Sequence, residues 1–299
     1  MASNNPARFP DFVIIGAAKS GTSTLFSYLE QHPGIFVSDP KEPCYFDLDD
    51  SWGRGEQWYA SLFSDARPDQ LCGEGSTNYT RWPQVDGVPQ RMKALIPNAK
   101  LIYLMRDPIT RSYSHFVHRW SREVHPGEPF TESFSQFVAH DPMCLDGSDY
   151  TTQIERFLDY YPREQLLLLT FEELASDPRA TLRQVFAFLG VEDISPEMEL
   201  GRRENDTRSV LERRIRNQIM SRYRRISLAG HPVSRLLPQG FKEWFFHRLQ
   251  ESKAGRRTAS QFVPPRMTAE ERAELLRRFA PRNVALRDAY GVDIGAWSS

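Results

Sequence analysis

A turn of small and hydroxyl-bearing residues follows the first apolar run of the chain and could hold a phosphate group. Residues 16–24, Gly-Ala-Ala-Lys-Ser-Gly-Thr-Ser-Thr, connect the apolar run Phe12–Ile15 to a segment with helical periodicity. Small residues let the backbone curl closely around an anion, and the first N–H groups of a helix have no partner within it. A lysine adds positive charge, and its presence beside three consecutive hydroxyl residues argues against an ordinary strand-to-helix turn. The pattern predicts a phosphate cradle made of Lys19, Ser20, Gly21, Thr22, Ser23 and Thr24.

The glycines of this loop have the spacing of a nucleoside-triphosphatase loop, but its lysine stands elsewhere. Gly16 and Gly21 match the pattern GxxxxGK[ST], whereas Thr22 occupies the lysine position and Lys19 precedes the second glycine. The loop instead resembles the 5′-phosphosulfate loop of sulfotransferases, which take a sulfuryl group from 3′-phosphoadenosine 5′-phosphosulfate (PAPS) and release the bisphosphate PAP. In that family the lysine contacts the phosphate of the leaving group, and the resemblance implies this role for Lys19.

A second group of candidate ligands follows the clearest strand pattern. Leu101–Met105 is a continuous apolar run, Arg106 comes directly after it, and Asp107-Pro108 then opens a helix. An arginine at the carboxyl end of a strand lies where open α/β sheets bind ligands, and its planar fork suits phosphate. Ser114 follows eight residues later, about two helical turns along. The stretch resembles the 3′-phosphate motif of sulfotransferases, which implies that Arg106 and Ser114 hold the 3′-phosphate of PAPS. The alternative interpretation of Arg106 is an ion pair with Asp107 at the start of the helix.

The segment Pro40–Phe46, Pro-Lys-Glu-Pro-Cys-Tyr-Phe, could supply a catalytic base. Proline after Glu42 favours extended backbone, so we expect the side chains of Lys41 and Glu42 to diverge, with one of them facing the pocket. The segment resembles the KExxFF-type stretch of heparan-sulfate-type sulfotransferases, whose glutamate is the base, and this implies that role for Glu42. Cytosolic aryl and steroid sulfotransferases use a histidine instead, so His115 or His118 is the alternative base. The alternative without catalysis is a surface Lys–Glu pair.

Two further stretches resemble parts of the same family. Residues 71–80 resemble its next strand and loop, where many heparan-sulfate members have Glu-Lys and this chain has Glu74-Gly75. The missing lysine argues against a glycosaminoglycan acceptor. Residues 253–257, Lys-Ala-Gly-Arg-Arg, resemble the loop that closes over the 3′-phosphate and adenine, which implies that Arg256 or Arg257 is a phosphate ligand. A solvated basic loop is the alternative.

The elements that must position these residues are short buried strands alternating with helices. Strands that are apolar on both faces and alternate with helices indicate a parallel sheet covered on both sides. We therefore predict an α/β fold with a central, mostly parallel sheet, helices on both faces and, by the resemblance, the P-loop-like three-layer form. Strands are expected at Phe12–Ile15, Ile35–Val37, Leu101–Met105 and Leu166–Phe171, and helices at about 21–31, from 108, at 178–189 and at 268–290, the last begun by Thr268 and Glu271 as a capping box.

Composition excludes several classes of protein. The chain has 299 residues with 38 Lys and Arg against 39 Asp and Glu, which disfavours a globally basic nucleic-acid binder. Its three cysteines, Cys44, Cys72 and Cys144, lack zinc-site spacing and are expected to be small buried residues in a reducing compartment, with no metal site. The polar start has no apolar signal-peptide region and no apolar stretch is long enough to span a bilayer, so we expect a cytoplasmic protein.

Charge is unevenly distributed along the chain. Residues 202–257 contain fifteen Lys and Arg against five Asp and Glu, and apolar residues recur there at helical spacing. The interpretation is one sulfotransferase domain, 1–299, with an α/β core at 10–194, a basic helical segment at 195–267 and a terminal helix at 268–290. The basic segment is expected to pack over the core as a lid or acceptor segment, with a peripheral membrane face for a lipid-like acceptor as the alternative.

Together these features predict a PAPS-dependent sulfotransferase that uses no metal. It would transfer the sulfuryl group in line to a hydroxyl, or an amine, of a small-molecule, saccharide or lipid-like acceptor, with Glu42 as base and Lys19 stabilising the leaving phosphate. Two alternatives remain open: a P-loop kinase that uses ATP and magnesium, and a non-catalytic nucleotide-binding protein of the same fold.

Overall fold

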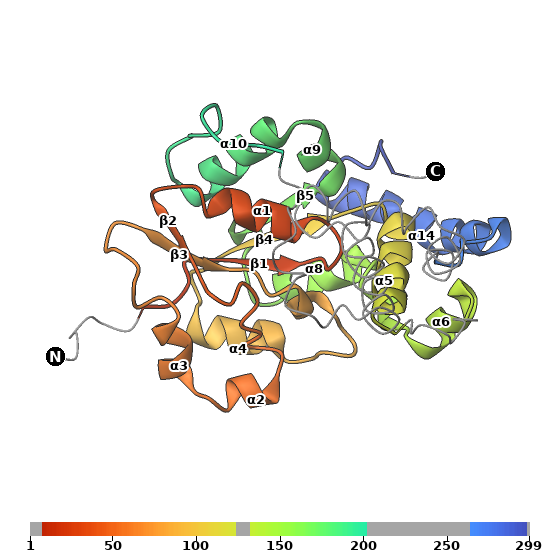
Figure 1. Cartoon of the computed structure of the whole chain (residues 1–299), viewed down its shortest axis with the longest axis horizontal. Coiled ribbons are helices and arrows are strands. Elements are labelled where there is room, and N and C mark those ends of the chain that lie inside the picture. Colours follow the sequence, from red (N-terminus) through yellow and green to blue (C-terminus); the bar gives the residue numbers. More distant parts are fainter. Residues whose placement is uncertain (1–7, 124–131, 202–263, 298–299) are drawn as a thin grey trace, which may run out of the picture. The chain divides into compact units, whose positions relative to one another are not determined.

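Five parallel strands form the central sheet in the computed structural model, which describes residues 8–123, 132–201 and 264–297. Each strand is short and apolar, and the spatial order is β2-β3-β1-β4-β5 (Figure 1). β1 pairs with β3 on one side and with β4 on the other, so the two predicted ligand-bearing strands are neighbours. The strands are β1 Phe12–Gly16, β2 Ile35–Val37, β3 Leu71–Glu74, β4 Lys100–Met105 and β5 Leu166–Thr170.

Helices connect the strands and cover both faces of the sheet. Alternate residues of β1 and β4 point to opposite sides: Ile15 and Tyr103 join one apolar cluster, and Ile14 and Leu104 the other. α4, α8 and α14 contribute to the first cluster and α1, α9 and α10 to the second; Figure 1 shows α1, α9 and α10 together on one side of the sheet. The helices are α1 Thr22–Leu29, α2 Asp49–Trp52, α3 Glu56–Ser61, η1 Thr77–Thr80, α4 Val88–Leu95, α5 Pro108–Glu123, α6 Phe134–His140, α7 Met143–Asp146, α8 Tyr150–Leu158, η2 Arg163–Gln165, α9 Phe171–Ser176, α10 Pro178–Leu189 and α14 Ala269–Tyr290.

The strand and helix predictions are confirmed, with small differences at the ends. Asp107 begins α5 as expected, because its Oδ1 accepts a hydrogen bond from the backbone N–H of Thr110 at 2.6 Å. Thr268 and Glu271 form the reciprocal capping box that begins α14. Phe171 was expected to end a strand but instead begins α9, because Thr170 caps that helix in a box with Glu173.

Contacts divide the chain into two compact units. The first contains 1–115, 138–204 and 268–299 and therefore holds the whole sheet, while the second contains 116–137 and 205–267. Arg256, Arg257 and most of the predicted basic segment 195–267 lie outside the described residues, so their roles and the domain organisation stay predictions.

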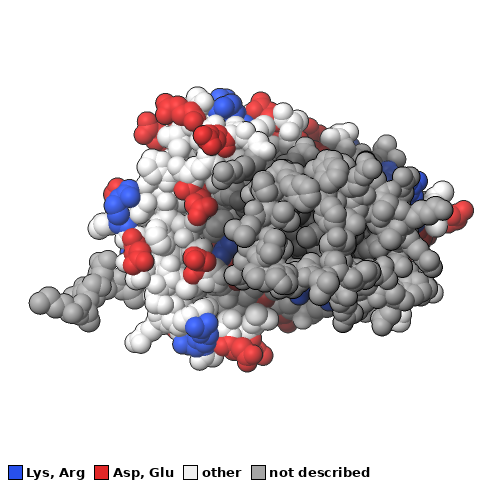
Figure 2. Space-filling model, in the orientation of Figure 1, with Lys and Arg blue, Asp and Glu red and all other residues white. Residues whose placement is uncertain are grey.

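Figure 2 shows acidic side chains spread over the described part of one face. Within the described residues, no helix combines the length and apolar character that a membrane span requires.

The first strand and the turn η1 are packed directly against each other. A Cβ atom on Gly16 would lie 2.0 Å from Thr80 Oγ1, and that hydroxyl donates to the carbonyl of Ile15 at 3.1 Å. Glycine at this position therefore lets η1 approach the end of β1. The close approach places the residues of η1 beside the loop that follows β1.

Candidate active site

The loop between β1 and α1 has the local geometry that an anion cradle requires. Lys19 and Gly21 both have left-handed backbone conformations, with φ of 71° and 89°. A Cβ on Gly21 would lie 2.6 Å from the ring of Phe171, so glycine is needed both for conformation and for packing. Gly21 is the N-cap of α1, and no side chain in the described part of the chain caps that helix. The first turn of α1 therefore presents N–H groups and the positive end of its dipole to the space inside the loop.

The donors of this loop fit a phosphate group. Ser20 is fully buried, and its Oγ has no hydrogen-bond partner among the described residues. An unpaired buried hydroxyl costs about 1–3 kcal/mol, which a bound oxyanion could offset. Thr22 is buried at the start of α1, and Ser23 and Thr24 are half-buried on its first turn. The predicted residues 19–24 are thus brought together around one loop.

Arg106 lies beside this loop because β4 pairs with β1. Its Nη1 donates to the carbonyl oxygen of Lys19 at 3.3 Å, and its guanidinium lies 4.6 Å from the ring centre of Phe171. Burial lowers the pKa of Arg106, while the carboxylate of Glu172 opposes that shift. An arginine held against the loop by one bond keeps most of its five donors for a ligand. Ser114 is half-buried on α5, as predicted, two turns beyond Arg106.

Glu42 lies close to the phosphate loop, although not in the way the sequence suggested. The expectation that Lys41 and Glu42 diverge is wrong, because Lys41 Nζ is 3.2 Å from Glu42 Oε1. The same Nζ donates to Thr22 Oγ1 at 3.4 Å and to Ser23 Oγ at 3.2 Å. Segment 38–44 is irregular, so the alternation of a regular strand does not apply to it. Lys41 therefore joins the first turn of α1 to the predicted base.

A hydroxyl from η1 also holds the carboxylate of Glu42. Thr77 Oγ1 donates to Glu42 Oε1 at 3.3 Å, while the side chain of Glu42 remains 38% exposed. The carboxylate is thus fixed at one oxygen and open to solvent, which suits a group that must reach a ligand. Sequence reasoning missed Thr77, and it named Lys41 only as a residue that could face the pocket in place of Glu42, without giving it a role.

Beneath Glu42, a buried carboxyl group organises the neighbouring turn. Glu74 is fully buried at the end of β3, and its Oε1 accepts hydrogen bonds from the hydroxyls of Tyr59 at 3.2 Å and Tyr79 at 2.7 Å. Its Oε2 accepts from the backbone N–H of Ser76 at 2.8 Å. Burial raises the pKa of Glu74 to about 7, and these hydrogen bonds, that of Tyr79 first, oppose the rise.

This network reaches the segment that carries Glu42. The hydroxyl of Tyr79 accepts a hydrogen bond from the backbone N–H of Tyr45 at 3.1 Å, and Ser76 Oγ accepts one from Cys44 at 3.0 Å. Next to Glu74, a Cβ on Gly75 would lie 3.3 Å from Lys41 Cε. The ring of Phe26, 3.2 Å from the same Cβ position, and the side chain of Lys41 therefore fill the space beside Gly75.

The two alternative histidines lie on α5. His115 is buried, with Nε2 3.6 Å from Asp141 Oδ2, and burial lowers its pKa. His118 is half-buried one turn later. Cys72 and Cys144 are buried as expected, whereas Cys44 is only partly buried, and none of these three described residues forms a disulfide. Within the described residues, no three of the His, Cys, Asp and Glu side chains gather as a metal would require.

The arrangement is that of a nucleotide-dependent transferase: an anion loop, an arginine at the adjacent strand end and a carboxylate that Lys41 links to the loop. The sequence matches the sulfotransferase domain family over residues 9–207, about two thirds of the chain, so the protein belongs to that family.

Individual relatives agree with this assignment. The chain is 32% identical over 202 residues to the human bifunctional heparan sulfate N-deacetylase/N-sulfotransferase 3, covering 62% of this chain and 22% of that protein. It is 30% identical over 192 residues to human heparan sulfate glucosamine 3-O-sulfotransferase 6, covering 62% of this chain and 54% of that protein. The matches thus span about a fifth and about half of these relatives. A sulfotransferase structure from Alicyclobacillus acidocaldarius superimposes with a TM-score of 0.54 at 30% identity, covering 70% of this chain and 90% of that one.

The buried carboxyl of Glu74 predicts a dependence of stability on pH. Because its folded pKa, about 7, lies above the ordinary value of 4.5, its stabilising effect is full below pH 4.5 and is lost as pH rises through 7. Between pH 5 and pH 8, the difference in unfolding free energy between wild type and Glu74→Gln should shrink by ~2 kcal/mol. Urea unfolding at both pH values measures this difference. A difference that stays constant would contradict a raised pKa at Glu74.

Proposed function

We propose that this protein transfers the sulfuryl group of PAPS to a hydroxyl or an amine of an acceptor molecule. The observation that carries the proposal is the contact between the two predicted anion-binding elements. Arg106 Nη1 lies 3.3 Å from the carbonyl of Lys19, so both lie at one edge of the sheet. Two anion-binding elements side by side suit a nucleotide that carries phosphate groups on both its 5′ and 3′ oxygens.

The donor would be held at two places. The loop amides, Lys19 and the hydroxyls of residues 20–24 would hold the 5′ side, and Arg106 with Ser114 would hold the 3′-phosphate. PAPS supplies an activated sulfuryl group whose transfer leaves negative charge on the 5′-phosphate. Charged and N–H donors preorganised around that phosphate stabilise the developing charge. Arg256 and Arg257 remain predicted additional ligands of the 3′-phosphate.

Glu42 would remove the proton from the attacking hydroxyl or amine. Its carboxylate accepts from Thr77 Oγ1 and pairs with Lys41, and it remains partly open to solvent. Lys41 also contacts the hydroxyls of Thr22 and Ser23, so it places a positive charge between the loop and the base. That charge would stabilise the carboxylate before the reaction and would lie near the group that is transferred.

The acceptor belongs to the broad class of saccharides and other small hydroxylated or aminated molecules. The two human relatives named above are heparan sulfate sulfotransferases, which supports a saccharide acceptor. The lysine that many heparan-sulfate members have at position 75 is absent here, which argues against a glycosaminoglycan acceptor in particular.

Donor identity predicts a pattern of thermal stabilisation. PAP should raise the melting temperature far more than ATP with magnesium, because a ligand at a hundred times its dissociation constant adds about 2.7 kcal/mol to stability. Lys19→Ala should lose most of the PAP shift. Lys93→Ala should keep it, because Lys93 is a half-buried lysine of α4 whose Nζ bonds the carbonyl of Pro97 and lies over the ring of Tyr161. A larger shift with ATP and magnesium than with PAP would favour a kinase and contradict the proposal.

The role of Glu42 predicts a loss of turnover without a loss of donor binding. Glu42→Gln keeps the shape and the hydrogen-bond acceptor but removes the base, so PAPS consumption in a panel of saccharide, phenol and amine acceptors should fall at least about a hundredfold. The matched variant Glu164→Gln, at an exposed glutamate of η2, should retain wild-type turnover. PAP should stabilise both variants as it stabilises wild type. Near-normal turnover in Glu42→Gln would remove Glu42 from the role of base.

A further inference from the structure

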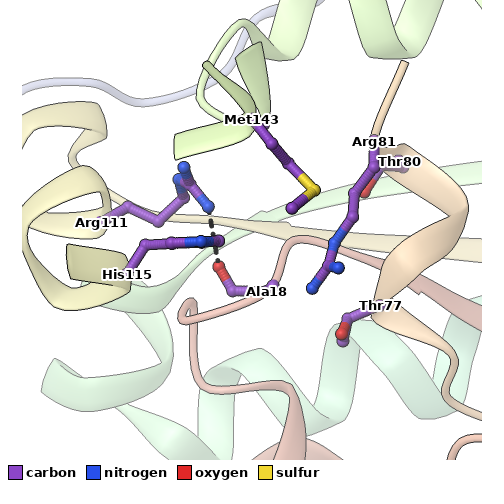
Figure 3. Close-up of a pocket in the computed structure, with 8 residues that line it drawn as sticks. Ala18, Thr77, Thr80, Arg81, Arg111, His115 and Met143 are labelled. Carbon is purple, nitrogen blue, oxygen red and sulfur yellow. Dashed lines mark hydrogen bonds between the residues drawn. The ribbon is translucent and has the colours of Figure 1, made fainter. Parts of the chain in front are cut away.

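A small pocket next to the phosphate loop is lined by two arginines for which no described residue supplies a carboxylate partner. Arg81 ends η1 and Arg111 lies on α5, and Figure 3 shows both reaching toward the pocket from opposite sides, with His115 beside Arg111. Ala18 of the phosphate loop and Thr77 of η1 also line it. The pocket therefore adjoins both the donor loop and the hydroxyl that holds Glu42.

Arg111 is fixed in place by neutral oxygen atoms. Its Nη1 donates to the carbonyl of Ala18 at 3.2 Å, its Nε to Ser148 Oγ, and its Nη2 to the carbonyl of Cys144. Among the described residues, none of its partners is a carboxylate. Arg111 as a residue is 2% exposed, so its positive charge is buried without a neutralising group in contact among the described residues.

Arg81 carries a second charge that no described residue pairs with. Within the described chain, its guanidinium makes no hydrogen bond, ion pair or ring contact, and in Figure 3 it extends between Ala18 and Thr77. Burial lowers the pKa of Arg81 and the nearby charge of Arg111 lowers it further, whereas the carboxylates of Glu42 and Asp47 oppose these effects from a distance. A largely buried guanidinium with free donors costs free energy unless a ligand pairs with it.

The position of Glu42 indicates which molecule would pair with the guanidinium of Arg81. As the proposed base, Glu42 must meet the hydroxyl or amine of the acceptor, and Thr77, which bonds its carboxylate at 3.3 Å, lines the same pocket as Arg81. A molecule whose hydroxyl or amine reaches Glu42 therefore has Arg81 within reach of another of its groups. Guanidinium forks bind planar or tetrahedral oxyanions with paired, charge-assisted bonds.

We propose that Arg81, with Arg111 and His115 behind it, forms a subsite for an oxyanion, a carboxylate or sulfate group, carried by the acceptor near the position that is sulfated. This inference rests on the proposed function for its assignment to the acceptor. As it stands, the pocket has no space for even a water-sized group, so binding of an oxyanion requires its side chains to move apart. Arg81, whose guanidinium has no partner among the described residues, is the residue that contacts the oxyanion. Arg111 positions the pocket wall through its bond to Ala18.

Chemical protection of Arg81 tests this subsite on the unmodified protein. The complex with PAP is treated with phenylglyoxal in the presence of sodium sulfate, sodium glucuronate or glucose. Sodium chloride keeps the ionic strength the same in all samples. Mass spectrometry follows the modification of each arginine. Arg81 should react faster than Arg111, whose nitrogens are bonded. Sulfate and glucuronate should each slow the modification of Arg81 at least about threefold, whereas glucose should leave its rate unchanged. Arg156, which pairs with Asp86 outside the pocket, should be unaffected by any of them.

The outcomes separate this inference from the proposed function. If PAP stabilises the protein but neither anion slows the reaction of Arg81, the subsite is wrong and the donor assignment stands. If PAP alone shields Arg81 completely, the arginine belongs to the donor site and the acceptor subsite is wrong. If PAP does not stabilise the protein, the proposed function fails, and with it the assignment of the oxyanion to an acceptor.

Discussion

The parallel pairing of β1 with β4 is the constraint on which the site depends. Phe12 aligns with Lys100 and Ile14 with Ile102 in this pair, so the loop after β1 and Arg106 after β4 emerge at the same edge. Parallel strands direct their carboxyl ends to one edge of a sheet, and that edge is where α/β proteins bind ligands. A strand inserted between β1 and β4, or a reversed β4, would separate the two groups of anion donors.

A second layer of organisation comes from the residues that follow β3. Glu74 joins Tyr59, Tyr79 and Ser76 through its carboxyl group, and Tyr79 and Ser76 in turn hold the backbone of residues 44–46. Thr77 belongs to the same turn and contacts Glu42. The proposed base is therefore positioned by a buried polar network rather than by a regular element. Such networks fix geometry strongly when every member has a partner.

The sequence predicted the parts of this structure that depend on local pattern. The apolar runs of β1, β4 and β5 and the caps at Asp107 and Thr268 are short-range features, and all are confirmed. Thr77 and the role of Lys41, which it missed, are set by contacts between distant segments. Thr77 meets Glu42 from 35 positions away, and Lys41 reaches Ser23 across 18 positions. Periodicity cannot show such contacts, and in the irregular segment 38–44 it predicted the wrong orientation for Lys41 and Glu42.

The most direct test of the account asks whether one nucleotide bridges the loop and Arg106. Calorimetry of PAP and AMP with wild type and Arg106→Ala compares ligands that differ only in the 3′-phosphate. Wild type should bind PAP at least about tenfold more tightly than AMP, since a hydrogen bond to a charged group contributes about 1.5–3 kcal/mol. Arg106→Ala should lose most of that preference while binding AMP within a few-fold of wild type. An unchanged preference for PAP in Arg106→Ala would show that the 3′-phosphate is bound elsewhere and would contradict the account.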